Sequence, residues 1–332
     1  MDRLGPAHLV LLASVARRYY LEGRSKVEIG EEFALSRFKV ARMLEEARSQ
    51  GLVRIEINSP GTVDVDLSWR LRERYGLRHA VVVDTADDDP VLLRGHVGRA
   101  AADLLTEIIT SQDVLGLGWA RALLDMTAAL THLPPCAVVQ LTGALSRTDV
   151  DASSIEIVRH VASLTKGPAH YFYAPMVVPD PATAAALLGQ PEIARAVGRF
   201  PDVTTAVVAV GSWDPPFSTL YDAVPPAERE ALIELGVRAD VSGVLLDAEG
   251  QAVHAPLARR IIGIDAAQLR RVPEILALAY GAEKIMAVDA SIRGGYVTSL
   301  VTHSALAQAL LARDPSGFAG AGAAAGPVEA GT

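Results

Sequence analysis

Three basic residues, Arg37, Lys39 and Arg42, lie within one short stretch that has the features of a helix. Ser36 directly precedes them and is of a type that caps helix N-termini, while Gly51 is typical of the position just past a helix end. Cations in the first turns of an exposed helix are placed to meet DNA phosphates and base edges. The stretch therefore predicts a helix that enters a groove of duplex DNA.

A second, shorter helix is expected directly before the basic one. Ser25 and Glu28 stand three positions apart and form a capping box, so that helix begins at Lys26 and ends by Ala34. Two helices joined by a tight turn are the outline of a helix-turn-helix. A preceding helix over roughly Leu9–Glu22 has one apolar face and would complete a three-helix core.

The outward side of the basic helix supplies the candidate DNA contacts. Val40 and Leu44 recur at helical spacing and face the core, which leaves Phe38 outside. Phe38 either contacts a thymine methyl group or packs against another part of the fold. A helical hairpin with a solvated charged face is the alternative for the whole stretch. The candidate DNA-binding residues are Ser25, Lys26, Ser36, Arg37, Phe38, Lys39 and Arg42.

The charge of the chain is distributed unevenly. Residues 1–58 contain ten Lys or Arg and eight Asp or Glu, a net charge of +2. Because the whole chain has a net charge of −8, the remainder has −10. A nucleic-acid partner is therefore expected for the first segment alone. At its end Val53, Ile55 and Ile57 alternate with charged residues and predict a short strand or wing.

Composition limits the remaining possibilities. The 332 residues, 50% hydrophobic and 5% aromatic, are enough for two domains of an α/β protein. No apolar run reaches the roughly 18 residues of a membrane span, and the first residues do not resemble a signal peptide. Cys136 is the only cysteine, which excludes an intrachain disulfide and a four-cysteine zinc site. We expect a cytoplasmic protein without a cofactor or a metal, and no membrane partner.

Beyond the first segment, apolar runs alternate with helical patterns. The runs AVVVD (80–84), VLGLG (114–118), AVVQL (137–141) and several later ones, KIMAV (284–288) among them, alternate with helical stretches such as 91–110. Such alternation predicts a parallel sheet with helices on both faces. The predicted organisation is a DNA-binding domain over 1–58, a linker over 59–65, an effector domain over 66–313 and a disordered Gly/Ala-rich tail over 314–332.

Ligands of an open α/β sheet bind beyond the C-terminal ends of its strands, so the loops there are candidates. Glycines after one strand would let backbone N–H groups approach an anion at a helix N-terminus; a tight turn that binds nothing is the alternative. Lysine suits a phosphate as a point charge, although Lys284 equally suits a solvated helix start. The candidate effector-binding residues are Gly116, Gly118, Trp119, Thr142, Gly143, Ser212, Asp214, Asp247, Glu283 and Lys284.

Several motifs in a fixed order resemble one family of bacterial regulators. Residues 16–58 resemble the N-terminus of the SorC, or DeoR-like sugar-binding, family of sugar-responsive transcription regulators. The similarity extends over roughly Leu9–Ala312. It continues through Val114–Leu123, Val138–Leu145, LLDAEGQAV (245–253), Arg259–Asp265, Leu269–Lys284 and Ile292–Leu311.

The resemblance implies a fold and a function. The effector domain is expected to be similar to the ribose-phosphate isomerase and glucosamine-phosphate deaminase fold, and Gly281–Lys284 resembles the family's stretch that supplies a phosphate-binding lysine. The expected partners are operator DNA, a sugar, polyol or sugar-phosphate effector, and further copies in a homodimer or homotetramer. The segment TGALSRTDVDASS (142–154) departs from the family because it lacks the lysine that lets some members form an imine with a sugar aldehyde.

A sugar-phosphate isomerase or deaminase with an appended helical domain is the alternative function. It requires a carboxylate and lysine acid–base set in the loops, for which Asp214, Asp247 and Glu283 are available. Their spacing shows no catalytic pattern, so a transcriptional regulator of a carbohydrate operon, without catalytic residues, is the favoured prediction.

Overall fold

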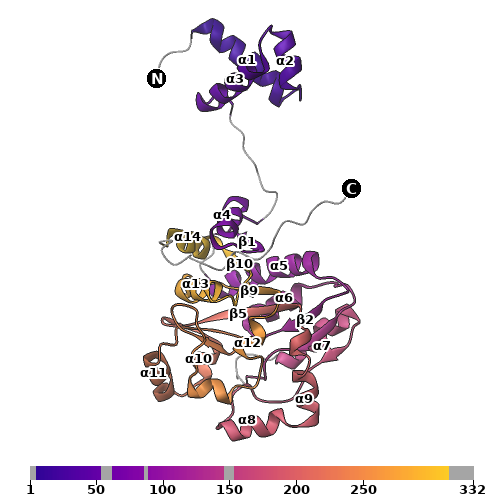
Figure 1. Ribbon diagram of the computed structural model, residues 1–332, viewed down its shortest axis with the longest axis vertical. Coiled ribbons are helices and arrows are strands. Elements are labelled where there is room, and N and C mark those ends of the chain that lie inside the picture. Colours follow the sequence, from indigo (N-terminus) through magenta and orange to yellow (C-terminus); the bar gives the residue numbers. More distant parts are fainter. Residues whose placement is uncertain (1–4, 54–61, 86–88, 146–152, 314–332) are drawn as a thin grey trace. The chain divides into compact units, whose positions relative to one another are not determined.

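The chain divides into two compact units, Met1–Pro60 and Gly61–Thr332 (Figure 1). The computed structural model describes residues 5–53, 62–85, 89–145 and 153–313. Most of the expected wing and the whole of the Gly/Ala-rich tail lie outside these described residues.

The first unit is a bundle of three helices, α1 (Pro6–Tyr20), α2 (Lys26–Glu32) and α3 (Arg37–Ser49). The Ser25 side chain and the Glu28 side chain form the expected capping box at the start of α2, and the Ser36 hydroxyl accepts a hydrogen bond from the backbone at the start of α3. The three helices share one small core, built from Leu12, Val15, Ala16, Ile29, Val40, Met43, Leu44 and Ala47.

The turn between α2 and α3 depends on one glycine. A Cβ atom on Gly30 would lie 2.6 Å from the carbonyl oxygen of Leu35, and the Leu35 N–H donates to the Gly30 carbonyl over 2.8 Å. Only a residue without a side chain permits this approach. Ala34 in the same turn has φ = 55°, in the left-handed region. The close approach fixes how α3 leaves α2.

The second unit is built on a seven-stranded parallel sheet in the order β1-β10-β9-β5-β2-β3-β4. Beyond its parallel part, the long strand β5 also pairs antiparallel with a small extension formed by β6, β7 and β8. The strands are β1 (His79–Val83), β2 (Val114–Leu117), β3 (Ala137–Gln140), β4 (Ala169–His170), β5 (Thr205–Trp213), β6 (Pro216–Phe217), β7 (Ala239–Val241), β8 (Val244–Leu246), β9 (Glu274–Leu278) and β10 (Ser299–His303).

Helices cover both faces of the sheet, as the alternation of the sequence predicts (Figure 1). The face with α5 (Pro90–Ile108), α6 (Arg121–Ala129) and α7 (Ser154–Thr165) has one apolar core. The opposite face has another, formed with α4 (Val65–Tyr75), α8 (Pro181–Leu188), α9 (Pro191–Val197), α13 (Ile285–Arg293) and α14 (Ser304–Ala312). The remaining helices are α10 (Thr219–Ala223), α11 (Pro226–Glu234), α12 (Ala266–Leu269) and the 3-10 turns η1 (Phe200–Asp202), η2 (Pro256–Arg260) and η3 (Ala282–Lys284).

One predicted strand is wrong. The run Lys284–Val288 is not a strand, because Ile285 begins α13, and the strand of this region is β9, Glu274–Leu278. Both segments are short apolar runs, and periodicity alone does not distinguish a buried strand from a buried helix of that length. The correction places Lys284 at the start of a helix instead of in the sheet.

The order of the strands creates a switch point between β2 and β5. From β2 the chain adds β3 and β4 on one side, whereas from β5 it adds β9 and β10 on the other. Loops after neighbouring strands diverge at such a point and leave a crevice beyond the strand ends. The fold therefore provides a ligand-binding position at the C-terminal end of β2, beside β5.

Candidate DNA-binding face and effector cavity

The outer face of α3 is exposed and basic. Ser36, Arg37, Lys39 and Arg42 are all exposed, and Phe38 is 81% exposed. Within residues 5–53, Phe38 therefore does not pack into the core. An apolar ring presented to solvent between basic residues suits contact with another molecule.

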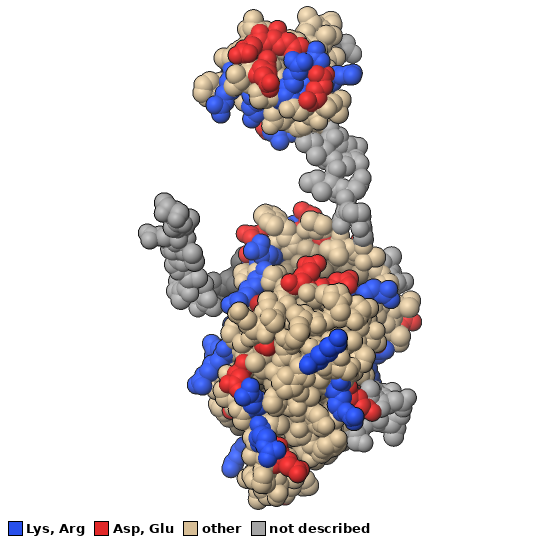
Figure 2. All heavy atoms as spheres, turned by 90° about the vertical axis from the view of Figure 1, so that its right-hand side faces the viewer, with Lys and Arg blue, Asp and Glu red and all other residues tan. Residues whose placement is uncertain are grey.

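The cations of this face differ from their neighbours in having no acidic partner in the described part of the unit. Arg18 and Arg24 bind Glu32, and Arg48 binds Glu45 over 2.6 Å. No ion pair of Arg37, Lys39 or Arg42 is found among residues 5–53. In Figure 2 acidic and basic residues lie close together on the visible side of this small unit. These ion pairs neutralise Arg18, Arg24 and Arg48, whereas Arg37, Lys39 and Arg42 are left available for an anionic partner.

The two serines and Lys26 have local roles in the same unit. The Ser25 hydroxyl accepts a hydrogen bond from the Glu28 N–H over 3.3 Å, and the Ser36 hydroxyl accepts one from the Lys39 N–H over 3.2 Å. The Lys26 ammonium lies 5.6 Å from the centre of the Tyr19 ring. The two serine hydrogen bonds set the starts of α2 and α3 and so position the exposed side chains.

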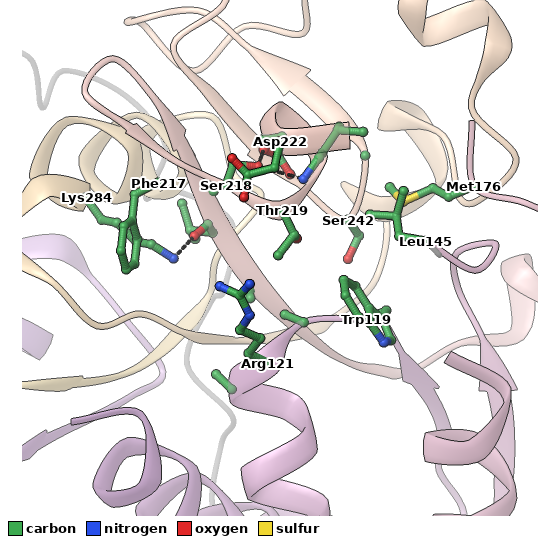
Figure 3. Close-up of a pocket in the computed structure, with 18 of the residues that line it drawn as sticks. Trp119, Arg121, Leu145, Met176, Phe217, Ser218, Thr219, Asp222, Ser242 and Lys284 are labelled. Atoms are coloured by element: carbon green, nitrogen blue, oxygen red, sulfur yellow. Dashed lines mark hydrogen bonds between the residues drawn. The ribbon is translucent and has the colours of Figure 1, made fainter. Parts of the chain in front are cut away.

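A cavity of about 230 Å³ opens at the switch point of the larger unit (Figure 3). Its walls come from the loop after β2 and the start of α6, from the end of β5, from the segment that begins α10, from the β7–β8 turn, and from the segment after β9. The lining residues that carry polar groups are Trp119, Arg121, Ser218, Thr219, Asp222, Asp240, Ser242, Tyr280 and Lys284.

Lys284 is a buried cation in the wall of this cavity. Its side chain is 5% exposed, and its Nζ donates to the Val210 carbonyl over 2.6 Å. The same nitrogen lies 4.9 Å from the centre of the Phe217 ring and 5.1 Å from that of Tyr280. Burial lowers the pKa of Lys284 to about 8, against the opposing effect of the nearby Asp240 carboxylate.

Asp240 on β7 is the acidic counterpart of Lys284. It accepts hydrogen bonds from Trp213 Nε1 over 2.9 Å and from the Ser218 hydroxyl over 2.5 Å. Burial raises the pKa of the Asp240 carboxyl, and these two hydrogen bonds act in the opposite direction. A Cβ atom on Gly211 would collide with both the Asp240 carboxylate and the Ser218 hydroxyl. Glycine at 211 is therefore what lets this polar cluster form.

Arg121 brings a second cation from the start of α6. Figure 3 shows its side chain extending into the cavity toward Thr219, on the same side as Lys284. The residue before it, Ala120, is the N-cap of α6 and has no side chain that accepts from the first N–H groups. A helix N-terminus without a side-chain cap favours an anion. Arg121 and this N-terminus therefore form a candidate anion-binding corner of the cavity.

Of the ten candidate effector residues, the structure brings Trp119 and Lys284 together in the cavity. The predicted glycines are packing positions. A Cβ on Gly116 would lie 2.8 Å from the Leu141 side chain, and one on Gly118 would lie 2.7 Å from the Ser242 hydroxyl. A Cβ on Gly143 would lie 2.7 Å from the neighbouring backbone. These glycines shape the site without lining it.

The other five candidates also lie outside the lining. Thr142 and Ser212 are buried, with hydroxyls for which the structure describes no hydrogen-bond partner. Asp247 accepts from the backbone of the turn after β8, which is a structural role. Asp214 and Glu283 are exposed, and the nearby charge of Glu283 acts to raise the pKa of Lys284.

Sequence reasoning missed most of the polar wall: Arg121, Ser218, Thr219, Asp222, Asp240, Ser242 and Tyr280. For two of them a signal is present. Arg121 follows the glycine loop, and Asp240 is a lone acid between Ala239 and Val241 in an apolar run, which is typical of a buried functional carboxylate. The segment around Ser218 gives no such signal.

Similarity to known proteins identifies the family. A family model described as "Putative sugar-binding domain" matches residues 59–312. The chain is 29% identical over 302 residues to the transcriptional regulator YjhU of Escherichia coli K12, covering 89% of this chain and 92% of the relative. It is 27% identical over 312 residues to the transcriptional regulator LsrR of Klebsiella pneumoniae, covering 91% and 93%. The chain belongs to the SorC family of sugar-binding transcriptional regulators.

A solved structure supports the same fold for this SorC-family chain. The full-length sorbitol operon regulator SorC from Klebsiella pneumoniae aligns with a TM-score of 0.70 and 21% identity, covering 92% of this chain and 99% of that one. The predicted α/β fold class is therefore confirmed. Because the relatives are regulators, the chain is a sugar-responsive regulator of transcription and not the isomerase-like enzyme of the alternative prediction. None of its described helices is long and apolar enough to cross a membrane.

Proposed function

We propose that α3 is the recognition helix of this regulator. The supporting observation is the exposed set of Arg37, Lys39 and Arg42, whose charges no acidic residue of 5–53 neutralises. Arginine and lysine bind phosphates and guanine edges, and Phe38 offers an apolar surface to a thymine methyl. Ser25 and Ser36 act by fixing the starts of α2 and α3.

We propose further that the effector is a phosphorylated sugar. The observation that carries this proposal is that the cavity combines two cations, Arg121 and Lys284, with an uncapped helix N-terminus. Three anion-binding features within one small cavity favour a phosphate group over a neutral ligand. The phosphate would lie at the start of α6, within reach of both cations.

The rest of the cavity suits a sugar. Asp222 and Asp240 offer carboxylate oxygens, and Ser218 and Ser242 offer hydroxyls, all of which form hydrogen bonds with sugar hydroxyl groups. Trp119, which Figure 3 shows below Ser242, supplies an aromatic surface for the C–H groups of the sugar. The cavity thus has one cationic region and one region that binds hydroxyl groups.

A homodimer or homotetramer is proposed as the DNA-binding form. Helix-turn-helix proteins pair their recognition helices with half-sites spaced by helical turns, which requires at least two copies. The structurally similar SorC protein is a sorbitol operon regulator, so an operon for sugar or polyol use is the proposed target. A cytoplasmic location, where bacterial DNA lies, is part of the same proposal.

A thermal-shift screen of the full chain tests the effector class. Pentoses, hexoses and polyols would each be compared with their phosphates at equal concentration. A ligand that binds only the native state raises the melting temperature by mass action. The proposal predicts that the largest shift comes from a phosphorylated compound. A largest shift from an unphosphorylated polyol, with its phosphate inactive, would contradict it.

A further inference from the structure

A cluster of buried polar groups lies away from the effector cavity but shares a helix with it. Asp289, five residues after Lys284, is 5% exposed. Its carboxylate accepts a hydrogen bond from the Tyr75 hydroxyl over 2.9 Å and pairs with Arg293 over 3.0 Å and Arg313 over 3.5 Å. The cluster therefore joins α13, which begins beside Lys284, to α4 and to the end of α14.

Helix α13 is held at both ends. At its start, Lys284 is fixed in the cavity wall by the Val210 carbonyl. Near its end, Arg293 donates to the Ala248 carbonyl over 2.6 Å, and a Cβ on Gly250 would collide with the Ala290 carbonyl. A helix packed this closely moves as a rigid body, because close-packed interiors transmit displacement instead of absorbing it. A shift of its first turn therefore reaches Asp289.

Helix α4 is the first helix of the larger unit. It begins at Val65, shortly after the boundary between the units at Pro60, and Tyr75 is its last residue. The Tyr75 hydroxyl also donates to the Leu310 carbonyl over 3.3 Å, so one phenol contacts both α13 and α14. Burial, followed by the nearby Asp289 charge, raises the pKa of Tyr75, so the phenol stays protonated and able to donate.

We infer that the Tyr75–Asp289 hydrogen bond transmits effector binding from Lys284 to α4. The inference rests on the proposed phosphate-binding role of the cavity. An anion bound at Lys284 competes with the Val210 carbonyl for its Nζ and shifts the first turn of α13. The displacement of Asp289 then changes the hydrogen bond that it accepts from the Tyr75 hydroxyl at the end of α4. Tyr75 and Asp289 are positioning residues: neither lines the cavity, and both act through α13.

The test uses the full chain, inorganic phosphate as the probe, and two readouts. The melting temperature reports binding, and amide hydrogen exchange over residues 67–75 reports the response of α4. Tyr75→Phe removes one hydroxyl and leaves the ring. Tyr171→Phe is the matched control, because this half-buried tyrosine packs on the opposite face of the sheet.

In the wild type and in Tyr171→Phe, phosphate should raise the melting temperature and change exchange in α4. In Tyr75→Phe the thermal shift should remain, while the exchange response becomes about fivefold smaller, as expected from the loss of one hydrogen bond. An undiminished exchange response in Tyr75→Phe would overturn the inference. Absence of a thermal shift in the wild type would instead overturn the proposed phosphate site.

A ligand-free measurement gives a second arm that does not depend on phosphate affinity. Lys284→Met should change α4 exchange in the wild-type background and leave it nearly unchanged in the Tyr75→Phe background, because the effects of residues coupled through one network are non-additive. Additive effects of Lys284→Met and Tyr75→Phe on α4 exchange would contradict transmission through the Tyr75–Asp289 hydrogen bond.

Discussion

The α3 face and the effector cavity both present cations to a proposed anionic partner, but in opposite settings. Arg37, Lys39 and Arg42 are exposed and unneutralised within their described unit, whereas Lys284 is buried and its pKa is lowered to about 8. An exposed cation loses little hydration on binding and is screened by salt. A buried one is pre-positioned, strengthened by low dielectric and sensitive to pH. The two sites should therefore respond to different variables, salt for DNA and pH for the effector.

Removal of the α3 charges should have the largest effect. Arg37→Ala/Arg42→Ala is expected to weaken operator binding about 100-fold or more, since each charge-assisted phosphate contact contributes about 1.5–3 kcal/mol. The slope of log affinity against log salt should also fall by about two units. Fluorescence anisotropy with DNA from upstream of its own operon measures both quantities.

Arg48→Ala is the control for that measurement. Arg48 lies on the same helix, but it is already paired with Glu45. Its loss should leave the affinity and the salt slope nearly unchanged. Equal losses in both variants would contradict the assignment of the outer face of α3.

Loss of the cavity arginine should have the next largest effect. Arg121→Gln is expected to lower the affinity for a phosphorylated effector by about 10- to 100-fold, because a charge-assisted hydrogen bond to phosphate is lost. DNA binding without effector should be unchanged. Isothermal titration calorimetry with the best compound of the thermal-shift screen measures the affinity. Arg195→Ala, on the exposed face of α9, is the control; a similar loss there would refute the anion-binding corner.

The pH dependence should separate the two sites further. The pKa of Lys284 is lowered in the folded chain to about 8 from 10.5, so between these pH values the unfolded chain binds a proton that the folded chain does not. The contribution of Lys284 to the free energy of unfolding therefore increases as pH rises from about 8 to 10.5. Affinity for an anion changes in the other direction, because the ammonium is lost as pH rises through about 8.

Lys284→Met should abolish both pH effects, and chemical denaturation and effector titration from pH 7 to 10 measure them. The exposed Lys166→Met is the control and should keep the wild-type profile. If effector affinity is flat across this range in the wild type, Lys284 does not contact the anion.

The smallest effect concerns the helix cap. Ser36→Ala removes the hydroxyl that accepts from the Lys39 N–H and should destabilise the N-terminal unit by about 1 kcal/mol. Ser49→Ala at the other end of α3 is the matched control. Thermal unfolding followed by circular dichroism measures the difference, and an equal effect of the two substitutions would rule out the capping role.

The difference between the N-terminal helices and the cavity also explains which parts of the structure can be predicted from sequence alone. The starts of α2 and α3 depend on Ser25, Glu28 and Ser36, which act within a few residues of themselves and are therefore predictable. The cavity joins residues from Trp119 to Lys284, which only the strand order brings together. Long-range pairing has no local signature, so sequence reasoning names the loop glycines, which pack closely against their neighbours, and does not find most of the residues that line the cavity.

The central claim is that the two sites are coupled. The most direct measurement is operator affinity with and without the sugar phosphate that gives the largest thermal shift. We expect a change of at least about fivefold in DNA affinity, and by linkage the same factor in effector affinity when DNA is bound. A compound that binds the cavity tightly and leaves operator affinity unchanged would contradict it.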